Sequence, residues 1–197
     1  LTNTDCQQNV QRSSMEWMKS KGAVLVKDNL FDVLRKEQKN EIDLKCTASV
    51  MMIKQNNFQL DLESLNLTSI RFGQDSANGI YTDSSNIFMR IETDKQESFT
   101  FRSINRVNAI ILSNNAINSF DGSKIDSQNF AFGSQLQSLH FNNNKLTRLS
   151  SNLSPFQNGL FSNLKFLNLN DNEIESIEDF SFSGLKSLSY LYLNNNK

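Results

Sequence analysis

Histidine and cysteine are scarce in this chain of 197 residues, and their scarcity limits the chemistry that it can perform. The one histidine, His140, cannot be paired by sequence spacing with a serine or cysteine nucleophile, and it has no second histidine for a His-x-x-x-His metal site. A C-x-x-C pair and a glycine-rich phosphate loop are also absent. The acidic run 171–179 lacks the sixth-position glycine and late glutamate of a calcium loop, so we interpret it as a solvent-exposed turn. We therefore expect no enzymatic activity, no metal site and no cofactor.

Long apolar runs and an excess of charge of one sign are absent as well. The longest apolar runs, 23–26 and 50–53, are far shorter than the roughly 20 residues that a membrane-spanning helix needs. Lysine and arginine number 20 and aspartate and glutamate 21, so the charge is nearly balanced. The sequence therefore predicts no membrane span within this chain and gives no electrostatic basis for a nucleic-acid partner.

A pattern of leucine and asparagine does recur through the C-terminal half. Residues 164–174 have the spacing L-x-x-L-x-L-x-x-N-x-L, with isoleucine in the last place. The same spacing begins at Val107, Leu136 and Leu188. The four units therefore begin at 107, 136, 164 and 188, at intervals of 29, 28 and 24 residues. Each unit predicts a short strand with its leucines pointing inward and an asparagine that bonds backbone groups in the following turn. The asparagines at that position are Asn115, Asn144, Asn172 and Asn196.

The chain resembles the extracellular leucine-rich-repeat proteins, a broad group that includes Toll-like receptor ectodomains and secreted invertebrate immune repeat proteins. The resemblance implies an α/β solenoid, a horseshoe with a parallel concave sheet, because one repeat cannot bury its apolar face alone. Residues 105–197 are its regular repeats. The family's caps commonly carry four closely spaced cysteines, whereas this chain has two.

The N-terminal residues 1–49 are expected to form an α+β cap on the solenoid. Ser13 and Glu16 have capping-box spacing for a short helix that ends before Gly22. Residues 23–26 and 42–46 read as strands, with a second amphipathic helix between them.

Residues 50–104 are interpreted as degenerate repeats. Leu62-x-x-Leu65-x-Leu67 keeps the apolar spacing but places Ile70 at the asparagine position. A second unit is expected through Ile87, Met89 and Ile91, followed by a short strand through Phe99 and Phe101.

Cys6 and Cys46 suggest one disulfide, which in the loop-entropy model would contribute roughly 4 kcal/mol by closing about forty residues. The alternative is two free thiols in a cytosolic protein. The glycosylation sequons at Asn66 and Asn152 favour an extracellular location. We also expect that any secretory leader has been removed before Leu1 and that the natural protein continues past Lys197.

The residues between the inward leucines should form three columns on the concave surface. Aromatic residues gather toward the C-terminal end of these columns, and the candidate ligand-binding residues are His140, Phe166, Asn168, Tyr190 and Tyr192. Large rigid side chains beside amides are typical of binding interfaces, although a solvated sheet surface has the same pattern.

The sequence therefore predicts a recognition module of a secreted or cell-surface protein, in innate immunity or adhesion. Its expected partner is another protein or a microbial ligand, and a second leucine-rich-repeat chain is a further possibility. The alternatives are a structural module that pairs with a second copy and a cytosolic scaffold.

Overall fold

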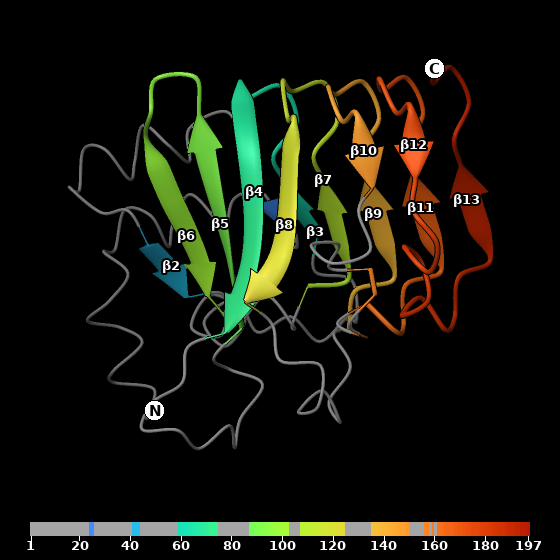
Figure 1. Cartoon of the computed structure of the whole chain (residues 1–197). Helices are drawn as coiled ribbons and strands as arrows, with labels where there is room; N and C mark the ends of the chain where they lie inside the picture. The colour runs from blue at the N-terminus through green and yellow to red at the C-terminus, as the bar shows by residue number, and fades with distance from the viewer. Residues whose placement is uncertain are drawn as a thin grey trace.

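Short parallel strands, one from each repeat, form the main sheet of the protein (Figure 1). The computed structural model describes residues 24–25, 41–43, 59–74, 87–102, 107–124, 135–149, 156–157, 159 and 161–197. We call the six-stranded sheet β1–β3–β7–β9–β11–β13 the front sheet. Its strands are β1 (Val24–Leu25), β3 (Gln59–Asp61), β7 (Ala109–Ile111), β9 (Ser138–His140), β11 (Phe166–Asn168) and β13 (Tyr190–Tyr192). All its pairings are parallel, as the repeat pattern predicted.

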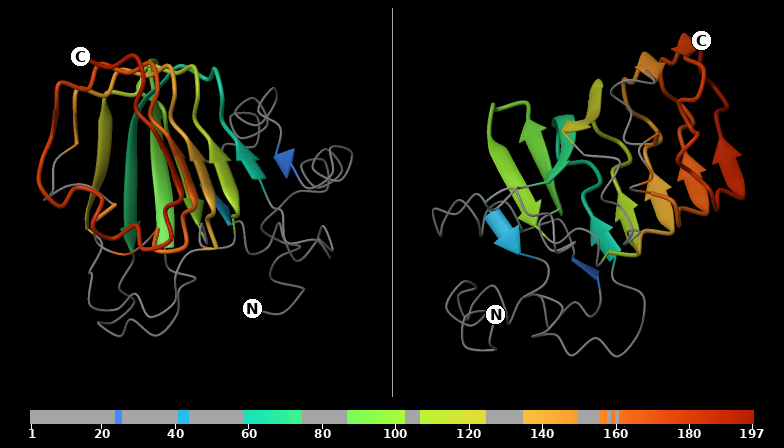
Figure 2. Two further views of the ribbon diagram at one scale, coloured as in Figure 1. Left: turned by 90° about the vertical axis from the view of Figure 1, so that its right-hand side faces the viewer. Right: turned by 60° about the horizontal axis from the view of Figure 1, so that its bottom comes forward.

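A second layer of strands faces the front sheet; it is the nearer layer in Figure 1, and the left view of Figure 2 shows the two layers side by side. The back sheet has five strands in the order β2–β6–β5–β4–β8, and a separate pair is formed by β10 and β12. These strands are β2 (Glu41–Asp43), β4 (Leu67–Gln74), β5 (Ile87–Thr93), β6 (Ser98–Arg102), β8 (Ser119–Lys124), β10 (Arg148–Leu149) and β12 (Ser176–Ile177). The chain passes from a front strand to a back strand and returns, which is the winding of a solenoid.

The core lies between the two layers and consists of the repeated leucine positions. In β3, β7, β9 and β11 the central residue points inward, and Leu60, Ile110, Leu139 and Leu167 are fully buried there, whereas Leu191 at the centre of β13 is 40% exposed. The next apolar position of each repeat is equally buried, at Leu62, Leu112, Phe141 and Leu169. The strands thus alternate partly buried, buried and partly buried residues, as a strand with one buried face does.

Phenylalanines from consecutive repeats stack behind this leucine core. The ring centroid of Phe120 lies 4.8 Å from that of Phe141 and 5.0 Å from that of Phe156. Phe156 in turn lies 5.9 Å from both Phe161 and Phe182. These tilted and edge-on contacts join three repeats, and aromatic pairs at such distances add to the free energy of burial.

Gly184 lets the backbones of two repeats approach closely beside this stack. Its N–H donates to the Phe156 carbonyl at 2.9 Å. A β-carbon at position 184 would lie 2.4 Å from that same oxygen, so the contact requires glycine.

The described residues contain strands and turns but no helix, so the α part of the expected α/β solenoid has no counterpart among them. The two strands expected in the cap region are present, because β1 falls within 23–26 and β2 overlaps 42–46 at the edge of the back sheet. The two expected helices lie outside the described residues. The boundaries of the cap and of the two repeat regions stay predictions. Within the described part, nothing helical is long and apolar enough to cross a membrane.

The expected register of the first degenerate repeat is wrong. The structure pairs Leu60 with Ile110, so Leu60 rather than Leu65 is the second leucine of that repeat. Leu65 then occupies the place that asparagine holds in later repeats, and Leu67 corresponds to Ile117. Several overlapping apolar spacings fit this segment, and without the asparagine the sequence does not choose among them.

The second expected unit, at Ile87, is a hairpin strand and not a repeat. β5 pairs antiparallel with β4 on one side and with β6 on the other, in the back sheet. Alternating apolar residues are common to any half-buried strand, so the pattern could not distinguish the two. The short strand expected through Phe99 and Phe101 is confirmed as β6.

This hairpin is inserted within one repeat. Consecutive front strands β3 and β7 are adjacent although their central residues are 50 positions apart, from 110 − 60. In the back sheet β5 and β6 lie between β2 and β4, while β1 and β3 pair directly in the front sheet. The insertion therefore widens only the back layer, and the front surface remains one strand per repeat.

Candidate ligand-binding surface

The front sheet presents the predicted columns in the predicted register. Phe166 is opposite Ser138 and Tyr190, and Asn168 is opposite His140 and Tyr192. Two columns lie within the strands, one through Ser138, Phe166 and Tyr190 and one through His140, Asn168 and Tyr192. The pairing of β7 with β9 extends them to Ala109 and Ile111, and the pairing of β3 with β7 extends them to Gln59 and Asp61. These last two residues were missed because the register of their repeat was misassigned.

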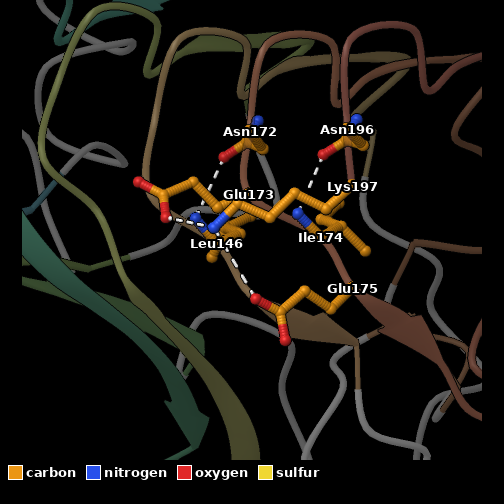
Figure 3. Close-up of polar contacts among 7 residues, drawn as sticks. All are labelled: Leu146, Asn172, Glu173, Ile174, Glu175, Asn196 and Lys197. Atoms are coloured by element: carbon orange, nitrogen blue, oxygen red, sulfur yellow. Dashed lines mark hydrogen bonds and ion pairs between the residues drawn. The ribbon is translucent and has the colours of Figure 1, made fainter.

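A ladder of asparagines holds one edge of this surface together (Figure 3). In each pair of neighbouring repeats the asparagine Nδ2 donates to carbonyls of both repeats; for Asn144 these are Leu112 at 2.9 Å and Phe141 at 3.0 Å. Its Oδ1 accepts from the backbone N–H of the preceding repeat, Ile117, at 3.0 Å. Asn115, Asn172 and Asn196 repeat this arrangement. The amide thus satisfies backbone groups that a tight turn leaves unpaired.

The residue before each ladder asparagine, and before Leu65 at the equivalent position, has a left-handed backbone. The φ angles are between 55° and 57° at Ser64, Asn114, Asn143, Asp171 and Asn195. Asparagine and aspartate tolerate this conformation better than other non-glycine residues. The abundance of Asn-Asn and Asp-Asn pairs therefore has a conformational cause at this position and is not by itself a sign of ligand binding.

Four rings form a continuous aromatic cluster on the front surface, which we define as His140, Phe166, Tyr190 and Tyr192. The Phe166 ring centroid lies 4.9 Å from His140, 5.3 Å from Tyr192 and 6.5 Å from Tyr190. Tyr190 is 59% exposed and Tyr192 38% exposed. The cluster therefore offers large rigid side chains at the surface whose mutual contacts already restrict their rotamers.

Asn168, the remaining predicted ligand-binding residue, is committed to its own turn. Its Oδ1 accepts from the Asn170 N–H at 3.0 Å, and Asp61 Oδ1 accepts from Glu63 N–H at 3.1 Å at the equivalent position. The third column contains Ser113 and Asn142, two residues after Ile111 and His140. Its side chains bond to one another from repeat to repeat, because Ser113 Oγ donates to Asn142 Oδ1 at 2.8 Å. These polar residues have a structural role, which leaves the rings as the better candidates for contact with a ligand.

His140 has a serine partner, contrary to the expectation from sequence spacing. Ser138 Oγ and His140 Nε2 are 2.9 Å apart, because residues two apart on a strand share one face. That i, i+2 spacing was the signal available in the sequence. No carboxylate is bonded to His140 among the described residues, so the third member of a catalytic triad is not in place there.

Burial lowers the pKa of His140 from its ordinary value of 6.5. An unfolded chain keeps the ordinary value, so below about pH 6.5 it takes up a proton that the folded chain binds less readily. We expect stability to fall as the pH is lowered through this value and His140 to make no contribution well above it. Urea unfolding at pH 7.5 and pH 5.5 should show a larger loss for the wild type than for His140→Gln. An equal loss in both would contradict the prediction.

A polar groove runs across the ends of the front sheet at which its strands begin. Its volume is about 370 Å³. Asn108, Gln137 and Lys165 each immediately precede a front strand, and Gln135, Asn163 and Ser187 lie two residues before Gln137, Lys165 and Ser189. Sequence reasoning missed this groove because these positions have no fixed residue type in the repeat.

The acidic run 171–179 is partly paired. Lys197 Nζ lies 3.1 Å from Glu173 Oε2 and 3.6 Å from Glu175 Oε1 (Figure 3). These carboxylates raise the pKa of Lys197, Glu173 first through a hydrogen bond. Among the described residues no group of three His, Cys, Asp or Glu side chains could hold a metal ion.

The remaining predicted sites are only partly covered by the structure. Asn66 is exposed in the turn before β4, with a φ of 56°, and its carbonyl accepts from the Asp94 N–H at 3.0 Å. Cys6, Cys46 and Asn152 lie outside the described residues. The disulfide and both glycosylation sites therefore stay predictions.

Residues 152–197 match the model of the leucine rich repeat family. Comparisons with curated proteins and with solved structures found no match to the chain. The matched segment includes β11, β12 and β13 and the ladder residues Asn172 and Asn196. The comparison thus supports the leucine-rich-repeat pattern in the two C-terminal repeats. Leucine-rich repeats generally mediate recognition of proteins and other ligands, and the proteins that carry them typically bind other proteins.

Proposed function

We propose that this chain is a non-enzymatic recognition module that binds a protein partner through the aromatic cluster. The observation that carries the proposal is the exposure of Tyr190 and Tyr192 on the edge strand of the parallel front sheet, beside Phe166. Tyrosines are enriched among the residues that dominate interface energies, because they bury much area at a small cost in side-chain entropy. A surface held by the asparagine ladder has little backbone order to gain on binding, which favours affinity.

Replacing both tyrosines should remove binding without unfolding the protein. We expect the Tyr190→Ala, Tyr192→Ala chain to bind its partner at least about thirtyfold more weakly, since the loss of a single hot-spot ring worth about 2 kcal/mol already has that effect. The measurement is capture of extracellular proteins by the immobilised chain, followed by titration of each captured protein. Phe180→Ala is the matched control, because Phe180 is 75% exposed but lies outside the front strands.

The same variants test the alternative of pairing with a second copy. A double variant that changes only the mass measured by light scattering would favour an assembly module. Unchanged capture and unchanged mass would remove the aromatic cluster from consideration.

The proposed location is extracellular, in a secreted protein or a receptor ectodomain with a role in innate immunity or adhesion. Exposure of Asn66 in a turn is compatible with a glycan there. We expect the chain secreted from eukaryotic cells to show, by intact mass, a Cys6–Cys46 disulfide and sugar at Asn66. Two free thiols and an unmodified Asn66 would instead favour the cytosolic scaffold, and the immune proposal would be withdrawn.

A further inference from the structure

We infer that the polar groove beside the front sheet is a binding site for a linear oligosaccharide that carries a carboxylate. The inference concerns a second site and does not depend on the aromatic cluster. The six described residues that line it are all polar: Asn108, Gln135, Gln137, Asn163, Lys165 and Ser187. Most small-molecule pockets are lined mainly by apolar side chains.

The groove is shaped for a linear ligand. Its residues come from successive repeats, and adjacent strands of a sheet are spaced by about 4.8 Å. Asn108, Gln137 and Lys165 thus recur at a regular interval across β7, β9 and β11, with a second row beside them. A chain of similar units laid across the strands would meet an equivalent polar side chain at each repeat.

An alternative linear ligand is an extended peptide bound through main-chain hydrogen bonds. The backbone groups at the ends where the front strands begin are not available for such bonds. The Asn108 carbonyl accepts from the Gln137 N–H at 2.7 Å, and the Gln137 carbonyl accepts from the Lys165 N–H at 2.9 Å. The Lys165 carbonyl accepts from the Ser189 N–H at 2.9 Å. Peptides that add to a sheet are bound by main-chain hydrogen bonds, which these groups already make with one another. Recognition at these ends therefore falls to the side chains.

The side-chain chemistry matches sugars. Amide groups donate through nitrogen and accept through oxygen, as sugar hydroxyls also do, and the groove has four amides and one hydroxyl. None of the described residues that line it is apolar, so they offer nothing to bury an apolar peptide side chain. Lys165 is the one charged residue among the described residues that line the groove, and its exposed ammonium is suited to one carboxylate of an acidic sugar.

Calorimetric titration tests the inference with three probes: tetragalacturonate, cellotetraose and tetraglutamate. We expect tetragalacturonate to bind most tightly and cellotetraose about tenfold more weakly, since a hydrogen bond to a charged group is worth about 1.5 kcal/mol or more. Gln137→Leu should weaken the binding of both sugars about tenfold, because leucine cannot form the hydrogen bonds of the Gln137 amide. Lys165→Met should reduce tetragalacturonate to the level of cellotetraose.

Two exposed residues outside the groove provide matched controls. Lys145→Met and Gln157→Leu repeat the chemical changes elsewhere on the surface and should leave sugar binding unchanged. Gln137 and Lys165 are also exposed, so thermal unfolding should show all four variants folded. Failure of both sugars to bind, insensitivity to Gln137→Leu, or equal binding of tetraglutamate would overturn the inference. None of these outcomes bears on the tyrosine experiment.

A free polysaccharide and a glycan attached to a glycoprotein share this chemistry. Titration with a sialylated serum glycoprotein, before and after enzymatic removal of its glycans, distinguishes these two sources. Binding that is lost on glycan removal and on Lys165→Met would identify an attached glycan. Binding of tetragalacturonate alone would identify a free acidic polysaccharide.

Discussion

Phe156→Ala is expected to destabilise the protein by about 3–5 kcal/mol, the usual cost of emptying a fully buried phenylalanine site. Phe156 has no exposed surface, and its ring contacts Phe120, Phe161 and Phe182 with centroid separations of 5.0, 5.9 and 5.9 Å. Those partners come from three repeats, so one truncation loosens the contacts between all three. The neighbouring backbone bond from Gly184 to the Phe156 carbonyl limits collapse of the cavity. Urea unfolding followed by circular dichroism measures the effect.

Phe180→Ala is the matched control for this truncation. Phe180 is 75% exposed, so its ring contributes little buried apolar area to stability. Its backbone is left-handed, with a φ of 65°. We expect its loss to change stability by no more than about 0.5 kcal/mol. If both variants lost similar stability, the phenylalanine stack would not be the element that joins the repeats.

Asn172→Ala is expected to cost about 3–5 kcal/mol although it removes only one small side chain. Asn172 is buried, and its Nδ2 donates to the carbonyls of Phe141 at 3.0 Å and Leu169 at 3.1 Å. Its Oδ1 accepts from the Leu146 N–H at 3.1 Å (Figure 3). Alanine would leave these backbone groups without partners, and each unsatisfied buried group costs about 1–3 kcal/mol. The measurement is the free energy of unfolding in urea.

Asn194→Ala makes the same chemical change at an exposed position of the last repeat. Its backbone N–H, which donates to Asn170 Oδ1 at 2.8 Å, is retained in the variant. We expect a change within about 0.5 kcal/mol. A small effect of Asn172→Ala would show that water replaces the ladder and that the asparagine is not required for the turn.

The regular repeats were predictable because each one meets the same two physical demands. A short strand must bury one side chain, which places leucine or isoleucine at its centre. The turn that follows must satisfy its backbone, which places asparagine five residues after that central residue. Ile110, Leu139 and Leu167 meet the first demand, and Asn115, Asn144 and Asn172 meet the second. Since both signals recur in register, the front columns followed directly from the alignment of the repeats.

The repeat that begins the described part was not predictable in the same way. Leu65 stands at the asparagine position, so only apolar spacing was left, and that spacing is ambiguous by several residues. Asn115 of the next repeat makes one bond here beyond the usual ladder, because its Oδ1 accepts from the Leu65 N–H at 2.8 Å as well as from the Leu67 N–H at 3.1 Å. The compensation comes from a residue about 50 positions away, which no local pattern contains.

The sequence by itself determined the solenoid, its parallel strands and the residues that face outward from them, because these depend on local periodicity and on one polar side chain per turn. The tertiary structure alone decided that 87–102 is a hairpin in the back sheet and that six described polar residues of successive repeats line one groove. Those features depend on which segments lie side by side, and that choice is made by the burial of the whole chain and not by any one stretch of it.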